Sequence, residues 1–196
     1  MKKKEFPIIA GVSNRHVHLS KEDLETLFGP GYQLTPTKDL GQPGQFACKE
    51  TVTIVGPKGS IENVRILGPV RKETQIEVSL TDAFKLGVTP PVRDSGDIEE
   101  TPGIVIIGPN GKKIEKEKGV ILAKRHVHMI PEDAEKFGVK DKDIVKVIVD
   151  HGDRRLIFDD VLVRVSEKFA LEFHVDTDEA NAALLKTGDV VYILEE

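Results

Sequence analysis

The sequence predicts a mainly β protein with short helices, made of two similar small β-barrel domains related by a pseudo-twofold axis, with the active site between them. Three observations support this prediction. The tetrapeptide Arg-His-Val-His occurs twice, at residues 15–18 and 125–128. The segments that follow the two copies match in their order of turns, strands and a short helix. Aromatic residues make up only 5% of the chain, while small and β-branched residues abound, which favours short strands and turns.

A short helix is predicted directly after each copy of the tetrapeptide. Superposing His16 on His126 also brings Asp23 onto Asp133. Ser20 has the character of a helix N-cap in the first copy, and Pro131 that of a first helical residue in the second. Gly29 and Gly138 then supply the residue type at which helices commonly end.

Beyond the helices, both halves read as turn, strand, turn, strand and short helix. Residues 60–67 and 156–163 have strand character, and "TQIEVSL" and "ALEFHVD" alternate apolar and polar residues. In this alignment Glu77 falls on His174. The first half must then carry extra loop, and the Gly- and Pro-rich stretch 29–45 is the obvious place for it.

The boundary between the two domains is predicted near residue 90. Pro90-Pro91 and Ser95-Gly96 mark a connection, and Asn110-Gly111 is the strongest hairpin signal in the chain. We therefore expect a first domain over residues 1–89 and a second over 90–196, which includes a connecting segment at 90–120.

Composition excludes several partners. The net charge of −5 gives no basic field for nucleic acid, and no apolar stretch reaches the ~18 residues that a membrane span needs. The single cysteine, Cys48, rules out an internal disulfide and fits a reducing cytoplasm. Cys48 lacks a neighbouring catalytic signature, so we expect it to be a buried or partly buried bystander rather than a nucleophile.

The repeated histidines predict two metal sites. In a strand, residues i and i+2 point to one face, so His-x-His presents two imidazoles side by side, which suits zinc or a similar metal. The alignment of Glu77 with His174 nominates a third ligand in each half. The ligand sets are His16, His18 and Glu77 in the first half, and His126, His128 and His174 in the second. Three ligands leave open coordination positions, as in catalytic sites. The alternative is that the tetrapeptide recurs for a structural reason, such as pairing of its arginine with a carboxylate.

Arg71 is a candidate anion-binding residue. It lies six residues before Glu77, an even spacing that would put both on one face of a strand. A guanidinium next to a metal is suited to holding a phosphate or a carboxylate for reaction. The alternative is a surface ion pair.

Four segments together carry a resemblance to a known family. "SNRHVHLS", "GPVRKETQIEVS", "PPVRDSGD" and "AKRHVHM" resemble those of the PduL-type phosphate propanoyltransferases, also called phosphate acyltransferases or phosphotransacylases, and the likeness runs from about residue 8 to 193. It implies reversible transfer of a propanoyl or acetyl group from coenzyme A to inorganic phosphate, giving an acyl phosphate, as in propanediol degradation. It also implies two β-barrels with a dinuclear zinc site, hence two zinc ions per chain.

The resemblance assigns roles to particular residues. His16, His18 and Glu77 would hold the first zinc, and His126, His128 and His174 the second. Arg71 would be the catalytic, phosphate-binding arginine. The contacts to coenzyme A would come from Val12, Ser13, Asn14, Lys58, Arg65 and Asn181, with Ser95 a further candidate.

Alternatives to acyl transfer stay open at this point. A dinuclear zinc hydrolase acting on thioesters or phosphoesters would use the same ligands, and so would a metal-binding module without activity. Microcompartment members of the family resemble one another in an extra N-terminal amphipathic helix, and only "MKKKEF" precedes the first apolar strand residues here. We therefore expect a free cytoplasmic enzyme, with a homodimer as one option for its assembly.

Overall fold

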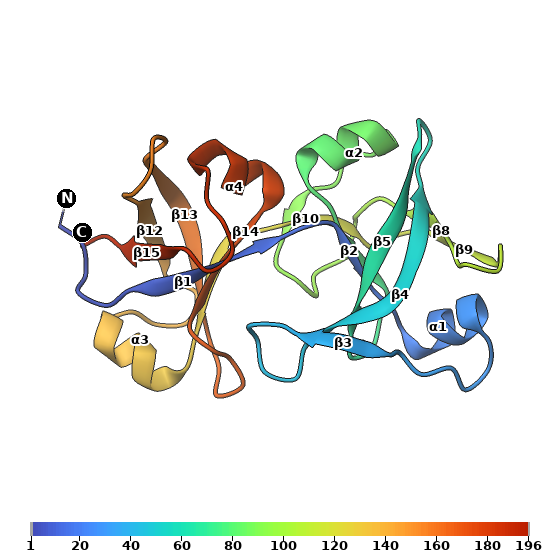
Figure 1. Cartoon of the computed structure of the whole chain (residues 1–196), viewed down its shortest axis with the longest axis horizontal. Helices are drawn as coiled ribbons and strands as arrows, with labels where there is room; N and C mark the ends of the chain where they lie inside the picture. The colour runs from blue at the N-terminus through green and yellow to red at the C-terminus, as the bar shows by residue number, and fades with distance from the viewer. Residues whose placement is uncertain (1, 196) are drawn as a thin grey trace. The chain divides into compact units, whose positions relative to one another are not determined.

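The computed structural model describes residues 2–195 and is mainly β, with short helices (Figure 1). This confirms the predicted fold class. The chain divides into two compact units. Unit 1 comprises residues 1–13, 41–43 and 124–196, and unit 2 comprises residues 14–40 and 44–123.

Unit 1 is a closed barrel of six strands. Their order around the barrel is β1 (Ile8–Ser13), β14 (Glu172–Asp176), β11 (His126–Met129), β13 (Leu156–Val165), β12 (Ile144–Val149) and β15 (Val190–Ile193). Helices α3 (Pro131–Phe137) and α4 (Thr177–Ala183) follow β11 and β14. The core gathers the inward residues of these strands with the apolar side of each helix, and Phe137 and Phe173 are its largest fully buried side chains.

Unit 2 is an open nine-stranded sheet. Its order is β7 (Val92–Arg93), β10 (Val120–Ala123), β6 (Gln75–Glu77), β2 (His16–His18), β5 (Ser60–Gly68), β4 (Phe46–Val55), β8 (Ile104–Ile107) and β9 (Lys113–Lys116), with β3 (Pro36–Asp39) paired to β4. Helices α1 (Lys21–Phe28) and α2 (Leu80–Leu86) follow β2 and β6. Both α1 and α2 bury leucines in the core of this unit.

The two units share a strand order, and they differ in closure. The run β1-β14-β11-β13-β12 in unit 1 corresponds to β10-β6-β2-β5-β4 in unit 2. Unit 1 closes because β15 pairs with both β12 and β1. In unit 2, β8 pairs with β4 and β9, and β10 pairs with β7, so the sheet stays open. One of the two expected barrels is therefore a curled sheet.

Each unit contains a strand that comes before the other unit's tetrapeptide. Strand β1 directly precedes β2 in the chain, yet it pairs with β14 and β15 of unit 1. Strand β10 directly precedes β11, yet it pairs with β6 and β7 of unit 2. We refer to this arrangement as the strand exchange. The units therefore differ from the expected division at residue 90, because segment 90–123 completes the first sheet and β1 completes the second barrel.

The local signals in the sequence are confirmed. Ser20 caps α1, since its Oγ accepts a hydrogen bond from the Asp23 amide. Gly138 ends α3 in the left-handed conformation, with φ 61°, where glycine has no steric penalty. Strands β8 and β9 form the expected hairpin, and Gly111 in its turn also has positive φ.

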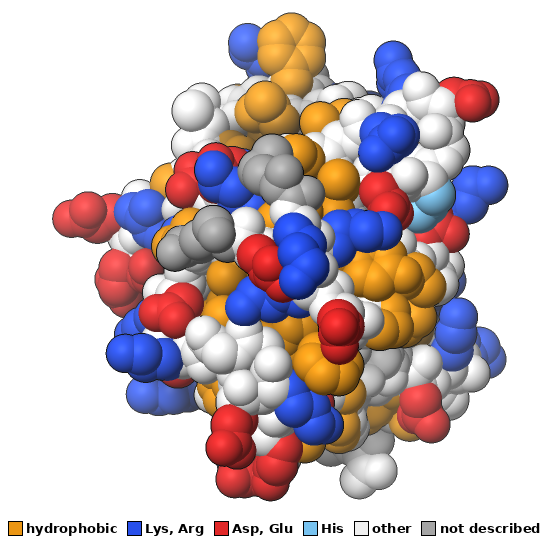
Figure 2. Space-filling view, turned by 90° about the vertical axis from the view of Figure 1, so that its left-hand side faces the viewer, with side chains coloured by type: hydrophobic (Ala, Val, Ile, Leu, Met, Phe, Trp, Pro, Cys, Tyr) orange, Lys and Arg blue, Asp and Glu red, His pale blue; other side chains and the backbone are white. Residues whose placement is uncertain are grey.

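Charged side chains of both signs are mixed on the face shown in Figure 2, with smaller hydrophobic areas between them. This mixture agrees with the modest net charge of −5. Within residues 2–195, no helix combines the length and the apolar character that crossing a bilayer requires.

Candidate metal centres

In unit 2, the His-Val-His part of the first tetrapeptide forms the central strand of a three-strand ladder. Strand β2 pairs in parallel with β5 and antiparallel with β6. His16 lies directly opposite Glu77, and His18 lies opposite Gln75. The two imidazole rings have centroids 5.0 Å apart. His16, His18 and Glu77 are all at least nine-tenths buried, so their polar atoms meet inside the protein rather than in solvent.

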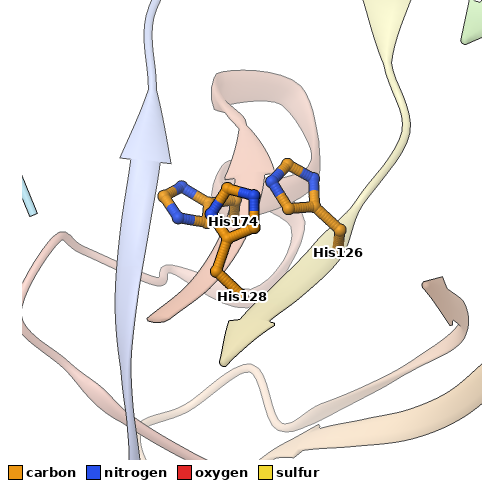
Figure 3. Close-up of side chains that lie close together, drawn as sticks. All are labelled: His126, His128 and His174. Carbon is orange, nitrogen blue, oxygen red and sulfur yellow. The ribbon is translucent and has the colours of Figure 1, made fainter. Parts of the chain in front are cut away.

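In unit 1, the second tetrapeptide is held in the same way. Strand β11 pairs in parallel with β13 and antiparallel with β14. His126 lies opposite His174, and His128 lies opposite Glu172. The three imidazoles gather at one place (Figure 3), with ring centroids between 4.5 and 4.9 Å apart.

The structure thus brings together both predicted ligand sets. In each set, one ligand atom per residue lies within 4.8 Å of the others. The third member of each set is the cross-strand neighbour of the first histidine, which is why the sequence alignment placed Glu77 on His174. Opposed residues on adjacent antiparallel strands have β-carbons about 5 Å apart, a spacing that suits shared coordination of one ion.

The ring nitrogens leave places that a metal would fill. Nδ1 of His16 lies 2.8 Å from the Asn14 carbonyl oxygen, and Nδ1 of His126 lies 2.7 Å from that of Lys124. Such backbone contacts fix the ring and leave Nε2 for a ligand role. Buried nitrogens of His18 (Nδ1) and His128 (Nδ1 and Nε2) have no hydrogen-bond partner in the described protein. Buried polar atoms without partners are costly and need an explanation. The residues therefore fit a metal that favours imidazole.

Electrostatics keep two of these imidazoles neutral. Burial, followed by the neighbouring His16 and Arg71, lowers the pKa of His18 to about 3. Burial, followed by His126 and His174, lowers the pKa of His128 to about 2. A neutral imidazole is the form that binds metal, so both rings are ready for coordination at neutral pH.

His16 and Glu77 form a coupled pair. Their Nε2 and Oε2 atoms are 3.4 Å apart. Burial opposes both charged forms, but the mutual attraction outweighs it, so the pKa of Glu77 lies well below its ordinary value and the pKa of His16 lies above it. Glu77 is therefore ionised, as a metal-binding carboxylate must be.

Arg71 reaches the unit 2 triad, but by a different route from the one predicted. It forms an isolated bridge with Ser20, and the chain bends at residues 72–73 before β6 begins. The expectation that one strand carries Arg71 and Glu77 is therefore wrong. Its Nη1 donates to Ser95 Oγ at 3.0 Å, and Ser95 Oγ donates to Glu77 Oε1 at 3.0 Å. A guanidinium thus lies one hydroxyl away from a candidate metal ligand.

Val12, Asn14 and Arg65, which were nominated for coenzyme A, each make hydrogen bonds with different partners. The Val12 amide donates to Thr187 Oγ1, and Ser13 ends β1. The side-chain oxygen of Asn14 accepts from the next amide in the chain. Arg65 donates through Nη1 to two backbone carbonyls of β4, each at 2.9 Å.

Two other nominated residues are exposed, namely Lys58 and Asn181. Lys58 lies in the turn between β4 and β5, and Asn181 lies on α4. Ser95 instead belongs to the Arg71 and Glu77 network described above.

Three residues near the triads were missed by sequence reasoning. Gln75 donates to Glu77 Oε1 at 2.6 Å, Glu172 Oε2 lies 3.2 Å from His174 Nε2, and Gln42 Nε2 donates to Glu172 Oε2 at 2.9 Å. Gln75 and Glu172 each stand two residues before a predicted ligand, so strand alternation could have found them. Gln42 lies in a distant loop and gave no signal.

The arginine of each tetrapeptide has a partner of its own. Arg15 Nε donates to Asp82 Oδ2 at 2.6 Å, and Arg125 Nη1 donates to Glu179 Oε1 at 2.6 Å. Each acid is the third residue of the helix that follows the third-ligand strand. The arginine of the tetrapeptide thus recurs for a structural reason, since in each unit it pairs with a carboxylate. Cys48 is fully buried, as expected, and burial raises its pKa to about 11, which disfavours a thiolate nucleophile.

The chain is similar to known proteins over nearly its whole length. A family model described as phosphate propanoyltransferase matches residues 9–186. The protein named phosphate propanoyltransferase from Thermotoga maritima is 79% identical over 98% of this chain and 91% of its own. Proteins of the same name from Clostridioides difficile (55% identical; 99% and 92% covered) and Rhodopseudomonas palustris (53%; 97% and 84%) are also similar. The chain is thus an acyltransferase, as predicted. It belongs to the phosphate propanoyltransferase family.

Proposed function

We propose that this protein catalyses the reversible transfer of a propanoyl group between coenzyme A and inorganic phosphate. In the forward direction, phosphate oxygen attacks the thioester carbonyl, the C–S bond breaks, and propanoyl phosphate and coenzyme A leave. The observation that supports this most is the family match over residues 9–186, which spans both triads and Arg71.

We further propose one zinc ion in each unit, hence two per chain. The donor set of five imidazoles and one carboxylate is typical of zinc, and the unpartnered nitrogens of His18 and His128 favour a bound ion. When bound, zinc supplies Lewis-acid chemistry, which stabilises a thiolate and polarises a carbonyl. His16, His18 and Glu77 would hold one ion, and His126, His128 and His174 the other.

Arg71 is the proposed phosphate-binding residue. A guanidinium presents five N–H donors in a fixed plane, which suits two oxygens of one phosphate. The Ser95 hydroxyl holds Nη1 of Arg71, so the planar group has a defined orientation beside Glu77. Holding phosphate in a fixed orientation lowers the entropy cost of attack. We assign coenzyme A contacts to Val12, Ser13, Asn14, Lys58, Arg65 and Asn181.

The experiment that tests this function is thiol release from propanoyl-CoA by the zinc-loaded protein, with and without phosphate. We expect release that requires phosphate, propanoyl phosphate as product, and about two zinc ions per chain by elemental analysis. Acetyl-CoA is the matched comparison, because one methylene is worth only about 1–3 kcal/mol in a pocket.

Other outcomes would redirect the assignment. Release that proceeds equally without phosphate would point to a thioester hydrolase, since a hydrolase uses water as the acceptor. Zinc binding without release from either acyl-CoA would leave a metal-binding module. A protein with neither zinc nor turnover would overturn both parts of the proposal.

A further inference from the structure

A loop from the first half of the chain is part of unit 1. Residues 41–43 belong to this unit, whereas the loop on either side belongs to unit 2. Gln42 is 5% exposed, and its amide is fully engaged. Nε2 donates to the Ala170 carbonyl at 3.0 Å and to Glu172 Oε2 at 2.9 Å, while Oε1 accepts from the Ala170 amide at 3.2 Å. Gln42 is thus hydrogen-bonded to the first residue of β14 and to the backbone just before it.

The carboxylate that Gln42 contacts lies beside the unit 1 triad. Glu172 is two residues before His174 on β14, so both side chains point to one face. Glu172 Oε2 lies 3.2 Å from His174 Nε2, and Gln42 Nε2 lies 3.5 Å from the same nitrogen. Among the described residues, the candidate metal-binding group of unit 1 consists of the three histidines, whose ligand atoms lie within 4.8 Å of one another. Glu172 is not part of this group.

Two glycines make room for this carboxylate. A β-carbon at Gly11 would lie 2.6 Å from Glu172 Oε1, and one at Gly41 would overlap both carboxylate oxygens. Backbone therefore approaches the carboxylate from two segments that are far apart in the sequence. Such close packing fixes the position of the Glu172 side chain, which in turn constrains the groups bonded to it.

Unit 2 contains a related chain of groups, in which the carboxylate, Glu77, is itself one of the three candidate ligands. There Gln75 Nε2 donates to Glu77 Oε1 at 2.6 Å, and Glu77 Oε2 lies 3.4 Å from His16 Nε2. In both units an amide thus holds a carboxylate that contacts an imidazole of the triad. The amide comes from the same strand in unit 2 and from the distant loop in unit 1.

We propose that Gln42 and Glu172 are positioning residues for the unit 1 metal site, through His174. Gln42 fixes the Glu172 carboxylate, and the carboxylate fixes the rotation of the His174 ring. This inference rests on the proposed zinc in that unit. Partners of this kind orient a ligand and raise its basicity, and their loss typically weakens metal binding about 10- to 100-fold.

The test is a zinc titration of chelator-treated, full-length protein against a competing chelator. We expect wild type to bind two zinc ions. Gln42→Met keeps the length of the side chain but removes its hydrogen bonds, and Glu172→Gln removes the charge. Each variant should lower the affinity for one of the two zinc ions about tenfold or more and leave the affinity for the other unchanged. Glu167→Gln, an exposed change in the same unit, is the control and should weaken neither.

Two further readouts separate positioning from a merely structural role. The visible spectrum of the cobalt-substituted protein should change for one ion in both variants, because its ligand geometry changes. If Gln42→Met and Glu172→Gln lower only the unfolding temperature of the metal-free protein, with both zinc affinities and the cobalt spectrum as in wild type, the inference is wrong and the proposed function stands. If wild type itself binds no zinc in unit 1, both are overturned.

Discussion

Within the tetrapeptide Arg-His-Val-His, each residue has a different task. The two histidines face the candidate metal, and the valine between them is fully buried in the core. The arginine turns to the third residue of a helix, at Asp82 in one unit and Glu179 in the other. The motif therefore ties a candidate metal site to the helix that follows the strand of its third candidate ligand.

Replacing Arg15 by Ala should destabilise unit 2. Asp82 is 4% exposed and would lose its charged partner, which costs about 1–3 kcal/mol in the free energy of unfolding. Urea denaturation at fixed metal content measures this change. Lys21→Ala, an exposed change on α1, should stay within about 0.5 kcal/mol of wild type. Equal stability of Arg15→Ala and wild type would show that the ion pair is dispensable.

Replacing Arg71 by Ala should impair phosphate-dependent turnover without removing metal. Loss of a hydrogen-bond donor that stabilises charge developing in the transition state typically lowers kcat about 10²- to 10³-fold. Steady-state thiol release with varied phosphate measures the effect, and elemental analysis should still find the wild-type zinc content. The neighbouring exposed residue supplies the control, because Lys72→Ala should keep near-normal turnover. Near-normal turnover of Arg71→Ala would refute the phosphate role.

At the residue scale, the sequence predicted the members of both triads because strand alternation and repeat alignment are local signals. Gln42 escaped prediction, since its partner Glu172 is brought near only by the fold. Arg71 was selected for a strand spacing that the bend at 72–73 removes. Its proximity to Glu77 depends instead on Ser95, whose position sequence reasoning could not place.

At the scale of elements, Asp23 links helix α1 to two other segments. Its Oδ2 accepts from Lys116 Nζ of β9 at 2.8 Å and from the Thr74 hydroxyl just before β6. Burial acts to raise the pKa of Asp23, but Lys116 and Thr74 outweigh it, so the pKa lies below its ordinary value. The ionised carboxylate therefore holds α1 in place.

Asp23→Asn should lower stability in a pH-dependent way. Because the pKa is depressed in the folded state, the unfolded chain binds this proton more tightly, and the stabilisation is present above about pH 4 and lost as the pH falls further. We expect a loss of about 1–3 kcal/mol at pH 7, which shrinks towards pH 3. Urea denaturation of both proteins across this range measures it. A difference that stays constant with pH would rule out the ionised carboxylate as the cause.

Element types were predictable, and their pairing was not. Capping signals and alternation located the short helices, several of the strands, and the hairpin of β8 and β9. They missed β4, and they missed β3, which lies in the stretch expected to be loop. Strands pair, however, through hydrogen bonds between backbone N–H and C=O groups, which are the same in every sequence. The sequence of a strand therefore does not show which strand lies beside it. That is why β1 and β10 were assigned to the wrong unit.

For the whole molecule, removal of residues 2–13 should open the unit 1 barrel. Strand β1 lies between β14 and β15, so its loss leaves two unpaired edges and takes support from the strand of His174. We expect zinc content to fall from two ions per chain to one. Elemental analysis and amide hydrogen exchange of unit 1 measure the change. Removal of residues 2–4 spares β1 and should keep both ions, whereas two ions in the longer deletion would show that β1 is not needed.

The strand exchange also bears on how such a chain can originate. A single repeat made alone would have a leading strand with no place in its own sheet, and a gap where the missing strand belongs. Two identical copies fill each other's gaps, so a symmetric pair of short chains is folded while either chain alone is incomplete. Fusion of the two genes keeps every pairing intact, whereas joining two finished barrels would not create it. The pairing of β1 with β14 and of β10 with β6 is therefore the pairing that two copies of one repeat would make by exchanging their leading strands.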